Sequence, residues 1–261
     1  MPLDHVALVR AKKEYGQDAY RLDLEAPALA AAFMPGQFVM AEIPGAGFDP
    51  MLRRPLGCFG VDAAAGRLSL LVQRVGRGTR LLGGMEAGQK MMILGPLGRG
   101  WTIPERGPVL IVAGGVGIVP LYDLAAACAA RVETVVVYGA RCREGLYLVE
   151  DLARLPLGLI PATEDGSLGW RGTAVGALEG LEPARFIRYY GCGPRPMLAG
   201  LRARMAAVGV EGELSLEERM ACGFGACLGC AVAVQSPDGG AAYKRVCTDG
   251  PVFPAGEVLF T

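Results

Sequence analysis

Four cysteines near the carboxyl terminus have the spacing of a metal-binding or redox site. They are Cys222, Cys227, Cys230 and Cys247, in the pattern C-x4-C-x2-C-x16-C. The first two gaps are those of plant-type ferredoxins, in which four thiolates hold a 2Fe-2S cluster. A loop around a negative cluster must aim backbone N–H groups at sulfur, and Gly223, Gly225 and Gly229 let the chain bend closely enough. A structural zinc site is the alternative, but zinc ribbons usually have two C-x2-C pairs and this chain has one.

Two glycine-bearing turns follow predicted buried strands in the middle of the chain. The first turn contains Gly114, Gly115 and Gly117. It joins a predicted strand at 109–113 to a helix that has Pro120 near its start, so a nucleotide pyrophosphate could approach the helix N-terminus. Packing alone can also require glycine at such a turn. Residues 189–194, with Cys192 and Gly193, repeat the arrangement, and two such turns at the carboxyl ends of one sheet predict a shared crevice.

An arginine pair earlier in the chain could bind phosphate. Arg53 and Arg54 precede Pro55, whose backbone dihedral is fixed. Two guanidinium groups could clamp a diphosphate, because their fork geometry matches phosphate oxygens. A solvated surface turn is the alternative reading of the same residues.

Composition excludes several classes of function. The 261 residues are 52% hydrophobic and carry 26 basic and 26 acidic side chains, without the basic excess of a non-specific nucleic-acid binder. The single histidine, His5, excludes catalysts that need several imidazoles. The start has no signal-peptide pattern, and the longest uncharged stretch, 107–122, is shorter than a membrane span of about 20 residues. We therefore expect a cytoplasmic protein, in which eight cysteines point to metal ligands or redox chemistry and away from disulfides.

Hydrophobic periodicity changes along the chain and predicts a multi-domain protein of the α/β plus β class. Short β-rich runs between Gly and Pro predict an antiparallel barrel over residues 1–100, with strands at 37–43, 68–73 and 90–94. Alternating strands and helices predict a Rossmann-like parallel sheet over 101–210. Its expected strands are 109–113, 134–138, 157–163 and 185–190, and its expected helices are 120–131, 144–155 and 195–208. A small cluster domain, with a strand at 231–235, is expected over 211–261.

Taken together and in order, these motifs resemble one family. The motifs are Arg-Pro-Leu-Gly at 54–57, Gly-Thr at 78–79, Gly-Pro-Leu-Gly-x-Gly at 95–100, Gly-Gly-Val-Gly at 114–117 and Cys-Gly-Pro at 192–194. They resemble the ferredoxin-reductase flavoprotein fold. The cysteine-rich segment 216–230, together with 243–253, narrows the resemblance to the electron-transfer subunit of class 1B dihydroorotate dehydrogenase, over essentially the whole chain.

The resemblance implies three cofactor sites. FAD would be held in the barrel by Arg54, Pro55, Leu56, Gly57, Leu71, Val72, Gln73, Gly78 and Thr79. Gly57 stands where the family commonly has a hydroxyl residue, which makes the backbone N–H near Cys58 our candidate for contacting flavin N5. NAD would bind at the glycine turns, with Cys192 beside the nicotinamide as the catalytic candidate. A small buried hydrophobic residue is the alternative reading of Cys192.

The resemblance also implies a function. An FMN-containing catalytic subunit would oxidise dihydroorotate for pyrimidine synthesis in a heterotetramer with this chain. This chain would pass the electrons through the 2Fe-2S cluster and FAD to NAD+. A subunit of another NAD(P)H-flavin oxidoreductase, of the ferredoxin:NADP reductase or hydrogenase type, is the alternative. A non-catalytic zinc-stabilised binding module is the alternative from another class.

Two parts of the sequence give opposite indications of whether the chain binds NAD or NADP. Arg141 and Arg143 follow the second strand of the predicted sheet and would favour a 2′-phosphate. In the family that the chain resembles, the ribose is read after the third strand, where Glu164 and Asp165 stand. A carboxylate repels a 2′-phosphate. We therefore expect NAD as the acceptor, with Glu164 as a cofactor-binding residue and the two arginines as a solvated rim.

Overall fold

The computed structural model describes residues 3–45, 47 and 49–260. Its contacts divide the chain into two compact units. One contains residues 1–100 with 217–231 and 245–251, and the other contains 101–216 with 232–244 and 252–261. The segments that carry the four cysteines of the motif therefore pack in the same unit as residues 1–100. The division into three consecutive domains stays a prediction.

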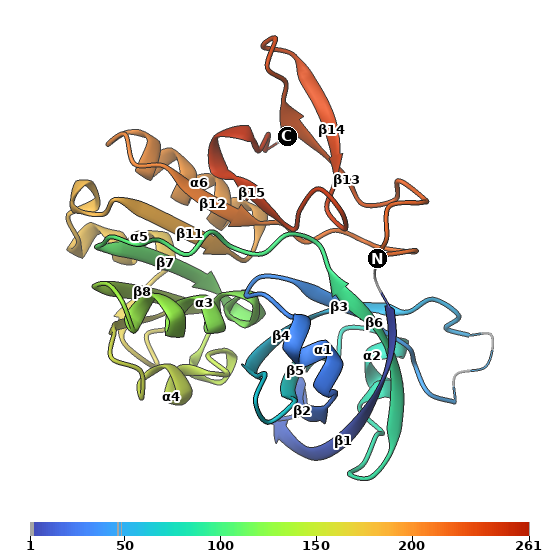
Figure 1. The fold of residues 1–261 in the computed structure, drawn as a ribbon. Helices are drawn as coiled ribbons and strands as arrows, with labels where there is room; N and C mark the ends of the chain where they lie inside the picture. Colours follow the sequence, from blue (N-terminus) through green and yellow to red (C-terminus); the bar gives the residue numbers. More distant parts are fainter. Residues whose placement is uncertain (1–2, 46, 48, 261) are drawn as a thin grey trace. The chain divides into compact units, whose positions relative to one another are not determined.

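The first unit is built on a closed barrel with the strand order β1-β2-β5-β4-β3-β6 (Figure 1). The strands are β1 (Leu3–Tyr15), β2 (Ala19–Glu25), β3 (Phe38–Ala41), β4 (Arg54–Asp62), β5 (Arg67–Gln73) and β6 (Lys90–Leu97). All neighbouring strands pair antiparallel, which confirms the predicted barrel. Period-two alternation explains the fold, because side chains such as Leu22, Leu24 and Leu70 enter one buried core. Two short helices, α1 (Pro27–Ala32) and α2 (Arg77–Leu82), connect strands.

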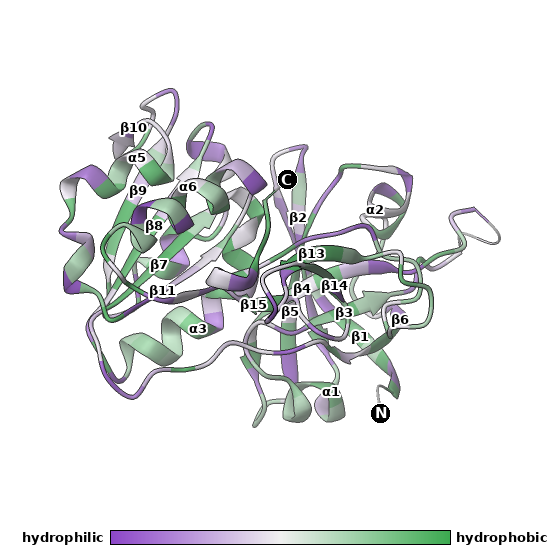
Figure 2. Ribbon diagram, turned by 90° about the horizontal axis from the view of Figure 1, so that it is seen from above, coloured by the Kyte–Doolittle hydropathy of each residue, from purple (hydrophilic) through white to green (hydrophobic). Residues whose placement is uncertain are grey.

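The second unit is built on a seven-stranded sheet with the order β10-β9-β8-β7-β11-β12-β15. The strands are β7 (Val109–Gly114), β8 (Thr134–Ala140), β9 (Gly158–Thr163), β10 (Trp170–Arg171), β11 (Arg188–Cys192), β12 (Gly212–Ser215) and β15 (Val252–Pro254). Every pairing is parallel except that of β12 with β15, which confirms the Rossmann-like sheet. Strands β7 and β8 are hydrophobic along their length because helices cover both faces (Figure 2).

The helices of this unit lie in the connections between its strands. They are α3 (Val119–Ala129), α4 (Val149–Leu152), α5 (Ala174–Ala177) and α6 (Arg195–Ala206), with 3₁₀ turns at Gly115–Ile118, Arg143–Gly145, Leu178–Gly180, Pro183–Arg185 and Ala255–Glu257. Helices α3 and α4 lie on one side of the sheet and α5 and α6 on the other (Figure 1). A separate two-stranded sheet pairs β13 (Ala231–Gln235) with β14 (Ala241–Arg245). None of the helices described is both long and apolar enough to cross a membrane.

Two predicted elements differ from the structure. The helix expected over 144–155 is a 3₁₀ turn followed by the single-turn helix α4. Gly145 weakens the start of that segment and Pro156 cannot continue a helix, so the regular α-helix between them is limited to the single turn of α4. The strand expected over 185–190 lies at Arg188–Cys192, because a 3₁₀ turn that begins at Pro183 occupies the preceding residues.

Candidate cofactor sites

The four cysteines of the motif are brought together in the first unit as two pairs. Cys222 is hydrogen-bonded to Cys227, and Cys230 is hydrogen-bonded to Cys247. Cys230 and Cys247 are buried, Cys222 is half-buried and Cys227 is exposed. Within the described part of the chain, no group of three or more His, Cys, Asp or Glu side chains has a geometry that would hold a metal ion. Two pairs are nonetheless what a two-iron cluster takes, since each iron uses two of the four thiolates.

Backbone N–H groups surround the thiols, as the glycines of the motif predict. The pKa of Cys222 is lowered below its usual value: burial raises it, but hydrogen bonds from the Cys227, Phe224 and Ala226 backbones outweigh that effect. The pKa of Cys247 is raised, chiefly by burial and then by its Cys230 neighbour. The backbone around Cys222 therefore favours negative charge on that sulfur, the property that a thiolate ligand to iron needs.

The loop conformation explains part of the motif. Gly223 and Gly225 adopt left-handed backbone angles, with φ of 78° and 91°. The third residue of this kind is Leu228, with φ of 57°, and not Gly229. A Cβ on Gly223 would lie 2.4 Å from Cγ of Met40 in β3, so this glycine also allows the loop to pack against the barrel. Conformation and close contact together require glycine at position 223.

A second segment ties the cluster loop to the barrel. The Arg99 backbone N–H donates to the Gly250 carbonyl at 2.6 Å, and Arg99 forms a bridge with Pro251. A Cβ on Gly98, which has φ of 73°, would lie 2.5 Å from Pro251 Cδ. The Gly-Pro-Leu-Gly-x-Gly motif thus makes a close contact with the segment that follows Cys247.

The predicted flavin residues gather where β4, β5 and α2 meet. The Arg54 guanidinium Nε lies 2.7 Å from the point that a Cβ on Gly78 would occupy, so a β4 side chain covers the first turn of α2. Among the described residues Arg54 has no carboxylate partner, whereas Arg53 forms ion pairs with Asp4 and Glu42. The two arginines therefore have different roles: Arg53 ties strands together and Arg54 is the cation available for an anionic ligand.

The remaining flavin candidates occupy consecutive positions on the same strands. Pro55, Leu56 and Gly57 are half-buried in β4 and pair with Met40, Val39 and Phe38 of β3. Leu71, Val72 and Gln73 end β5 directly before the turn that leads into α2. Thr79 is buried, and its hydroxyl bonds both the N–H and the carbonyl of Gly76 within its own turn. Thr79 thus shapes the α2 turn through its side chain.

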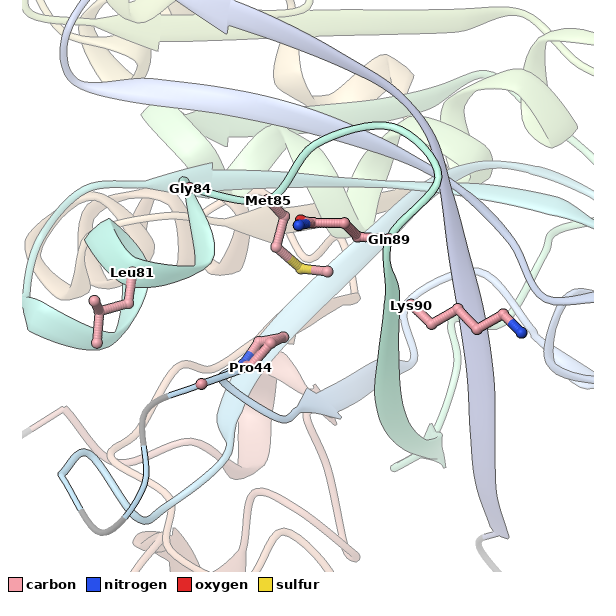
Figure 3. Close-up of a pocket in the computed structure, with 7 residues that line it drawn as sticks. Pro44, Leu81, Gly84, Met85, Gln89 and Lys90 are labelled. Carbon is pink, nitrogen blue, oxygen red and sulfur yellow. The ribbon is translucent and has the colours of Figure 1, made fainter.

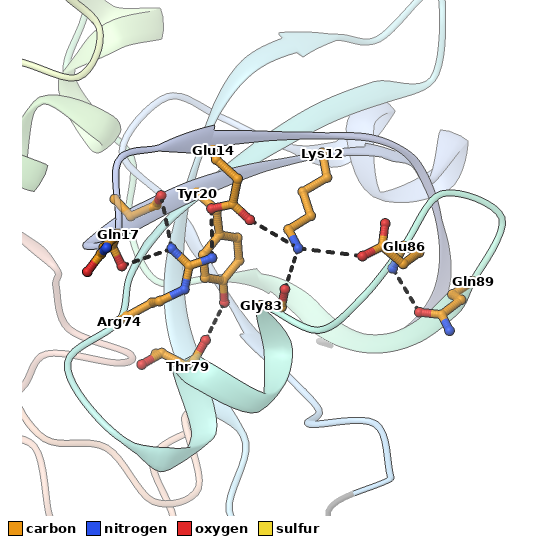
Figure 4. A network of polar contacts seen from close by, with 10 residues as sticks. Lys12, Glu14, Gln17, Tyr20, Arg74, Thr79, Gly83, Glu86 and Gln89 are labelled. Carbon is orange, nitrogen blue, oxygen red and sulfur yellow. Dashed lines mark hydrogen bonds and ion pairs between the residues drawn. The ribbon is translucent and has the colours of Figure 1, made fainter.

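A buried network fixes the α2 turn to the barrel (Figure 4). Tyr20 of β2 is fully buried, and its hydroxyl donates to the Thr79 carbonyl at 2.6 Å. The Arg74 guanidinium lies 4.7 Å from the centre of the Tyr20 ring and pairs with Glu14 at 2.7 Å. Lys12 joins Glu14 to Glu86 beyond the helix. These supporting residues were not predicted; the only sequence signal is a tyrosine in the alternating apolar run of β2.

A surface hollow lies beside the end of α2 and the segment that leads from α2 into β6 (Figure 3). Its volume is about 490 Å³ and its lining includes Leu81, Met85, Gln89 and Lys90. Apart from Met85, these lining residues are exposed. None of the predicted cofactor residues lines it, so the flavin assignment does not rest on this hollow.

The two predicted glycine turns of the second unit do converge. Strands β7 and β11 are parallel neighbours, and β8 and β12 lie on their outer sides, so the strand order reverses between them. A Cβ on Gly117 would lie 2.4 Å from the Cys192 carbonyl oxygen, and one on Gly193 would lie 3.0 Å from the Gly114 nitrogen. The two turns thus touch backbone to backbone at a topological switch point, where open α/β sheets bind ligands.

The glycines of these turns serve different purposes. Gly114 and Gly117 are required by packing, since a Cβ on Gly114 would lie 2.8 Å from both Met197 and Pro194. Gly115 has φ of 55° and nothing within 4 Å of its Cβ position, so the space beside it is open to a ligand. Cys192 ends β11 and is fully buried. Its assignment beside a nicotinamide stays a prediction.

Glu164 and Asp165, which would repel the 2′-phosphate of NADP, lie at the same edge of the sheet as Arg141, which would attract it. The Glu164 N–H donates to the Ala140 carbonyl and the Asp165 N–H to the Arg141 carbonyl, both at 3.1 Å. Glu164 and Arg141 are exposed. Hydrogen bonds from the Ser167 side chain and backbone lower the pKa of Asp165, which keeps it ionised. A ribose at this edge would meet carboxylates and arginines together.

The comparisons with known proteins decide the family. Residues 217–259 match the iron-sulfur cluster binding domain of dihydroorotate dehydrogenase B, and residues 7–101 match the oxidoreductase FAD-binding domain. A protein of Desulforamulus reducens is 38% identical over 93% of both chains, and one of Geobacillus thermodenitrificans is 39% identical over 96% of both. Both relatives are named dihydroorotate dehydrogenase B (NAD(+)), electron transfer subunit. This chain belongs to that family.

Solved structures of other oxidoreductases share the fold of this member of the dihydroorotate dehydrogenase B electron transfer family. The structure of an NADH-dependent reduced ferredoxin-NADP oxidoreductase is 29% identical and superposes with a TM-score of 0.86, over 97% of this chain and 89% of that one. A ferredoxin reductase in carbazole 1,9a-dioxygenase, 21% identical over 80% of this chain and 67% of that one, has a TM-score of 0.68 and shows the shared fold. The ferredoxin-reductase-like fold that the sequence predicts is thereby confirmed.

The residues of this family member fit the cofactors that its domains imply. The two thiol pairs have the four sulfur atoms that two irons would need, and the hydroxyl of Thr248, which follows Cys247, is buried with no hydrogen-bond partner among the described residues. In the barrel, Arg54 fills the space that a Gly78 side chain would take and has no carboxylate partner among the residues described. Sequence reasoning missed Thr248 because its only signal is adjacency to Cys247.

Proposed function

We propose that this chain is the electron transfer subunit of a dihydroorotate dehydrogenase and delivers electrons from dihydroorotate oxidation to NAD+, as a step of pyrimidine synthesis. The observation that supports this most is found in one compact unit: a barrel whose Arg54 has backbone carbonyl partners but no carboxylate partner among the described residues, together with a loop that has two thiol pairs. The names of the relatives, at up to 39% identity over 96% of the chain, supply the reaction.

Each site has a separate task in this proposal. Cys222 and Cys227 would hold one iron of a 2Fe-2S cluster, and Cys230 and Cys247 the other. Arg54 would neutralise the pyrophosphate of FAD, while Tyr20 holds the adjoining α2 turn in place. When bound, these groups supply the one-electron and hydride chemistry that no side chain of this protein can provide.

The second unit would bind NAD. Gly115 leaves open space at the switch point for the dinucleotide backbone, and Gly193 belongs to the turn that faces it. Glu164 and Asp165 would accept hydrogen bonds from the ribose hydroxyls and repel a 2′-phosphate. Arg141 and Arg143 would remain a solvated rim on the same edge.

The partner would be a catalytic subunit that carries FMN and binds dihydroorotate. Apart from the cysteines, the sites contain no buried acid-base side chain among the described residues that would deprotonate a pyrimidine ring. We extend the proposal to a heterotetramer in the cytoplasm, where a reducing environment keeps thiols free for iron. The open face of the cluster loop, where Cys227, Phe224 and Leu228 are exposed, is accessible to such a partner.

One alternative has specific support, namely a subunit of another NAD(P)H-flavin oxidoreductase, because the solved relative at 29% identity is a ferredoxin-NADP oxidoreductase. The test is affinity purification of the tagged chain from its native cell, followed by identification and mass measurement of the complex. A dihydroorotate dehydrogenase catalytic chain that contains FMN, in equal amount, is the expected partner. A different oxidoreductase subunit in its place would refute the proposal and favour the alternative.

A further inference from the structure

Thr248 carries a polar atom that the protein leaves without a partner. Its hydroxyl oxygen is buried, and no donor or acceptor among the described residues reaches it. An unsatisfied buried hydroxyl is destabilising, so native proteins rarely keep one without a ligand or water nearby. The residue directly follows Cys247, a member of the inner thiol pair.

The surroundings of Thr248 are those of the cluster loop. A Cβ on Gly225 would lie 2.9 Å from the Thr248 methyl carbon and 3.5 Å from its hydroxyl oxygen. The Gly225 backbone N–H in turn hydrogen-bonds the Cys247 thiol. The side chain of Thr248 therefore lies against the same backbone that supplies a hydrogen bond to a cluster ligand.

Arg245 and Asp249 hold Thr248 in this position. Arg245 donates from its guanidinium Nη1 to the Gly225 carbonyl at 3.0 Å, and its backbone N–H donates to the Asp249 carboxylate at 2.7 Å. The Thr248 N–H donates to the Arg245 carbonyl at 3.3 Å. The hydroxyl is thus presented by a fixed turn and not by a mobile surface residue.

We propose that the Thr248 hydroxyl donates a hydrogen bond to a sulfur atom of the 2Fe-2S centre and thereby raises its reduction potential. The inference rests on the proposed function, since it requires that the four thiolates hold this cluster. Hydrogen bonds to cluster sulfurs are among the factors that set the potential, because they stabilise the additional negative charge of the reduced state. Thr248 is a positioning and tuning residue and takes no part in a bond that forms or breaks.

The test is redox titration of the complete protein, followed by electron paramagnetic resonance, for Thr248→Val, Thr248→Ala and Thr248→Ser. Valine and alanine should shift the midpoint potential of the cluster to more negative values, while the potential of FAD stays unchanged. Serine, which keeps the hydroxyl, should restore the native potential. Pulsed resonance in H2O and D2O should show the loss of one exchangeable proton coupling in the valine and alanine variants only.

The control is Thr134→Val in the other unit, where a buried hydroxyl donates to the Val132 carbonyl at 3.0 Å. This variant should leave the cluster potential unchanged. A native potential and native proton couplings in Thr248→Val or Thr248→Ala, with full iron and sulfide content, would overturn the inference. Absence of iron and sulfide from the native protein would instead contradict the proposed function, so the two failures are distinguishable.

Discussion

Arg54 and Gly78 share one small space: the Arg54 guanidinium Nε lies 2.7 Å from the point where a Cβ on Gly78 would stand. The strand residue and the helix residue are 24 positions apart in the sequence, and the barrel brings them together. A side chain at position 78 can be accommodated only if the guanidinium moves. The contact therefore couples the shape of the α2 turn to the position of Arg54, the arginine that we propose binds the FAD pyrophosphate.

Gly78→Ala should weaken FAD binding by about tenfold or more, because hydrogen bonds to charged groups contribute about 1.5–3 kcal/mol. Titration of the flavin-free protein with FAD, followed by fluorescence, measures the change. Gly180→Ala is the control, since a Cβ at Gly180 meets nothing within 4 Å. Equal FAD affinity for Gly78→Ala and the native protein would show that the pyrophosphate is not bound by Arg54.

Tyr20→Phe should lower both stability and FAD affinity, because the Thr79 carbonyl loses its buried donor at 2.6 Å and the α2 turn loosens. The matched control is Tyr190→Phe, which removes a hydroxyl that donates to the Thr102 carbonyl at 2.7 Å in the second unit. Each variant should lose about 1–2 kcal/mol of unfolding free energy. Only Tyr20→Phe should raise the Kd for FAD. An equal rise in Kd for Tyr190→Phe would show that FAD affinity falls because the protein is less stable, and not because the α2 turn has lost its support.

Serine at any of the four motif cysteines should abolish or greatly weaken cluster binding. The change removes one thiolate from a pair that holds an iron. Iron and acid-labile sulfide are measured per chain for Cys222→Ser, Cys227→Ser, Cys230→Ser and Cys247→Ser, with Cys58→Ser, Cys128→Ser and Cys142→Ser as controls that should remain normal. Normal values in any of the first four would mean that the ligand set is wrong.

Glu164→Arg should shift the preference of the enzyme from NADH toward NADPH by about tenfold in the ratio of kcat/KM values, because a repelling carboxylate becomes an attracting cation. Glu211→Arg makes the same charge change before the amino end of the parallel strand β12, away from the carboxyl edge, and should leave the ratio unchanged. A native preference for NADPH, or an unchanged ratio in Glu164→Arg, would show that another strand reads the ribose.

Much of the fold follows from periodicity in the sequence. The apolar runs of β5, β7 and β8 can be placed from the sequence alone, because a strand that is buried on both faces consists of consecutive, mostly apolar residues. The 144–155 segment could not be placed in the same way. Its apolar residues reach the core from a turn and a single helical turn, and no local pattern encodes that arrangement.

The sites were predictable to the extent that spacing encodes them. The cysteine pattern predicts the ligands, and the structure adds that they stand in two pairs. Contacts between distant residues left no signal: Arg53 and Arg54 look equivalent in the sequence, yet only Arg53 has an acidic partner within the described residues. The buried hydroxyls of Tyr20 and Thr248 are recognisable only once the surrounding backbone is known.

The most direct test of the central claim is reconstitution with the catalytic partner under anaerobic conditions. The isolated chain should reduce artificial acceptors with NADH but should not oxidise dihydroorotate. The purified catalytic subunit alone should not reduce NAD+. The two chains together should form orotate and NADH in equal amounts. Orotate formation by this chain alone, or reduction of NAD+ by the catalytic subunit at the same rate without it, would contradict the account.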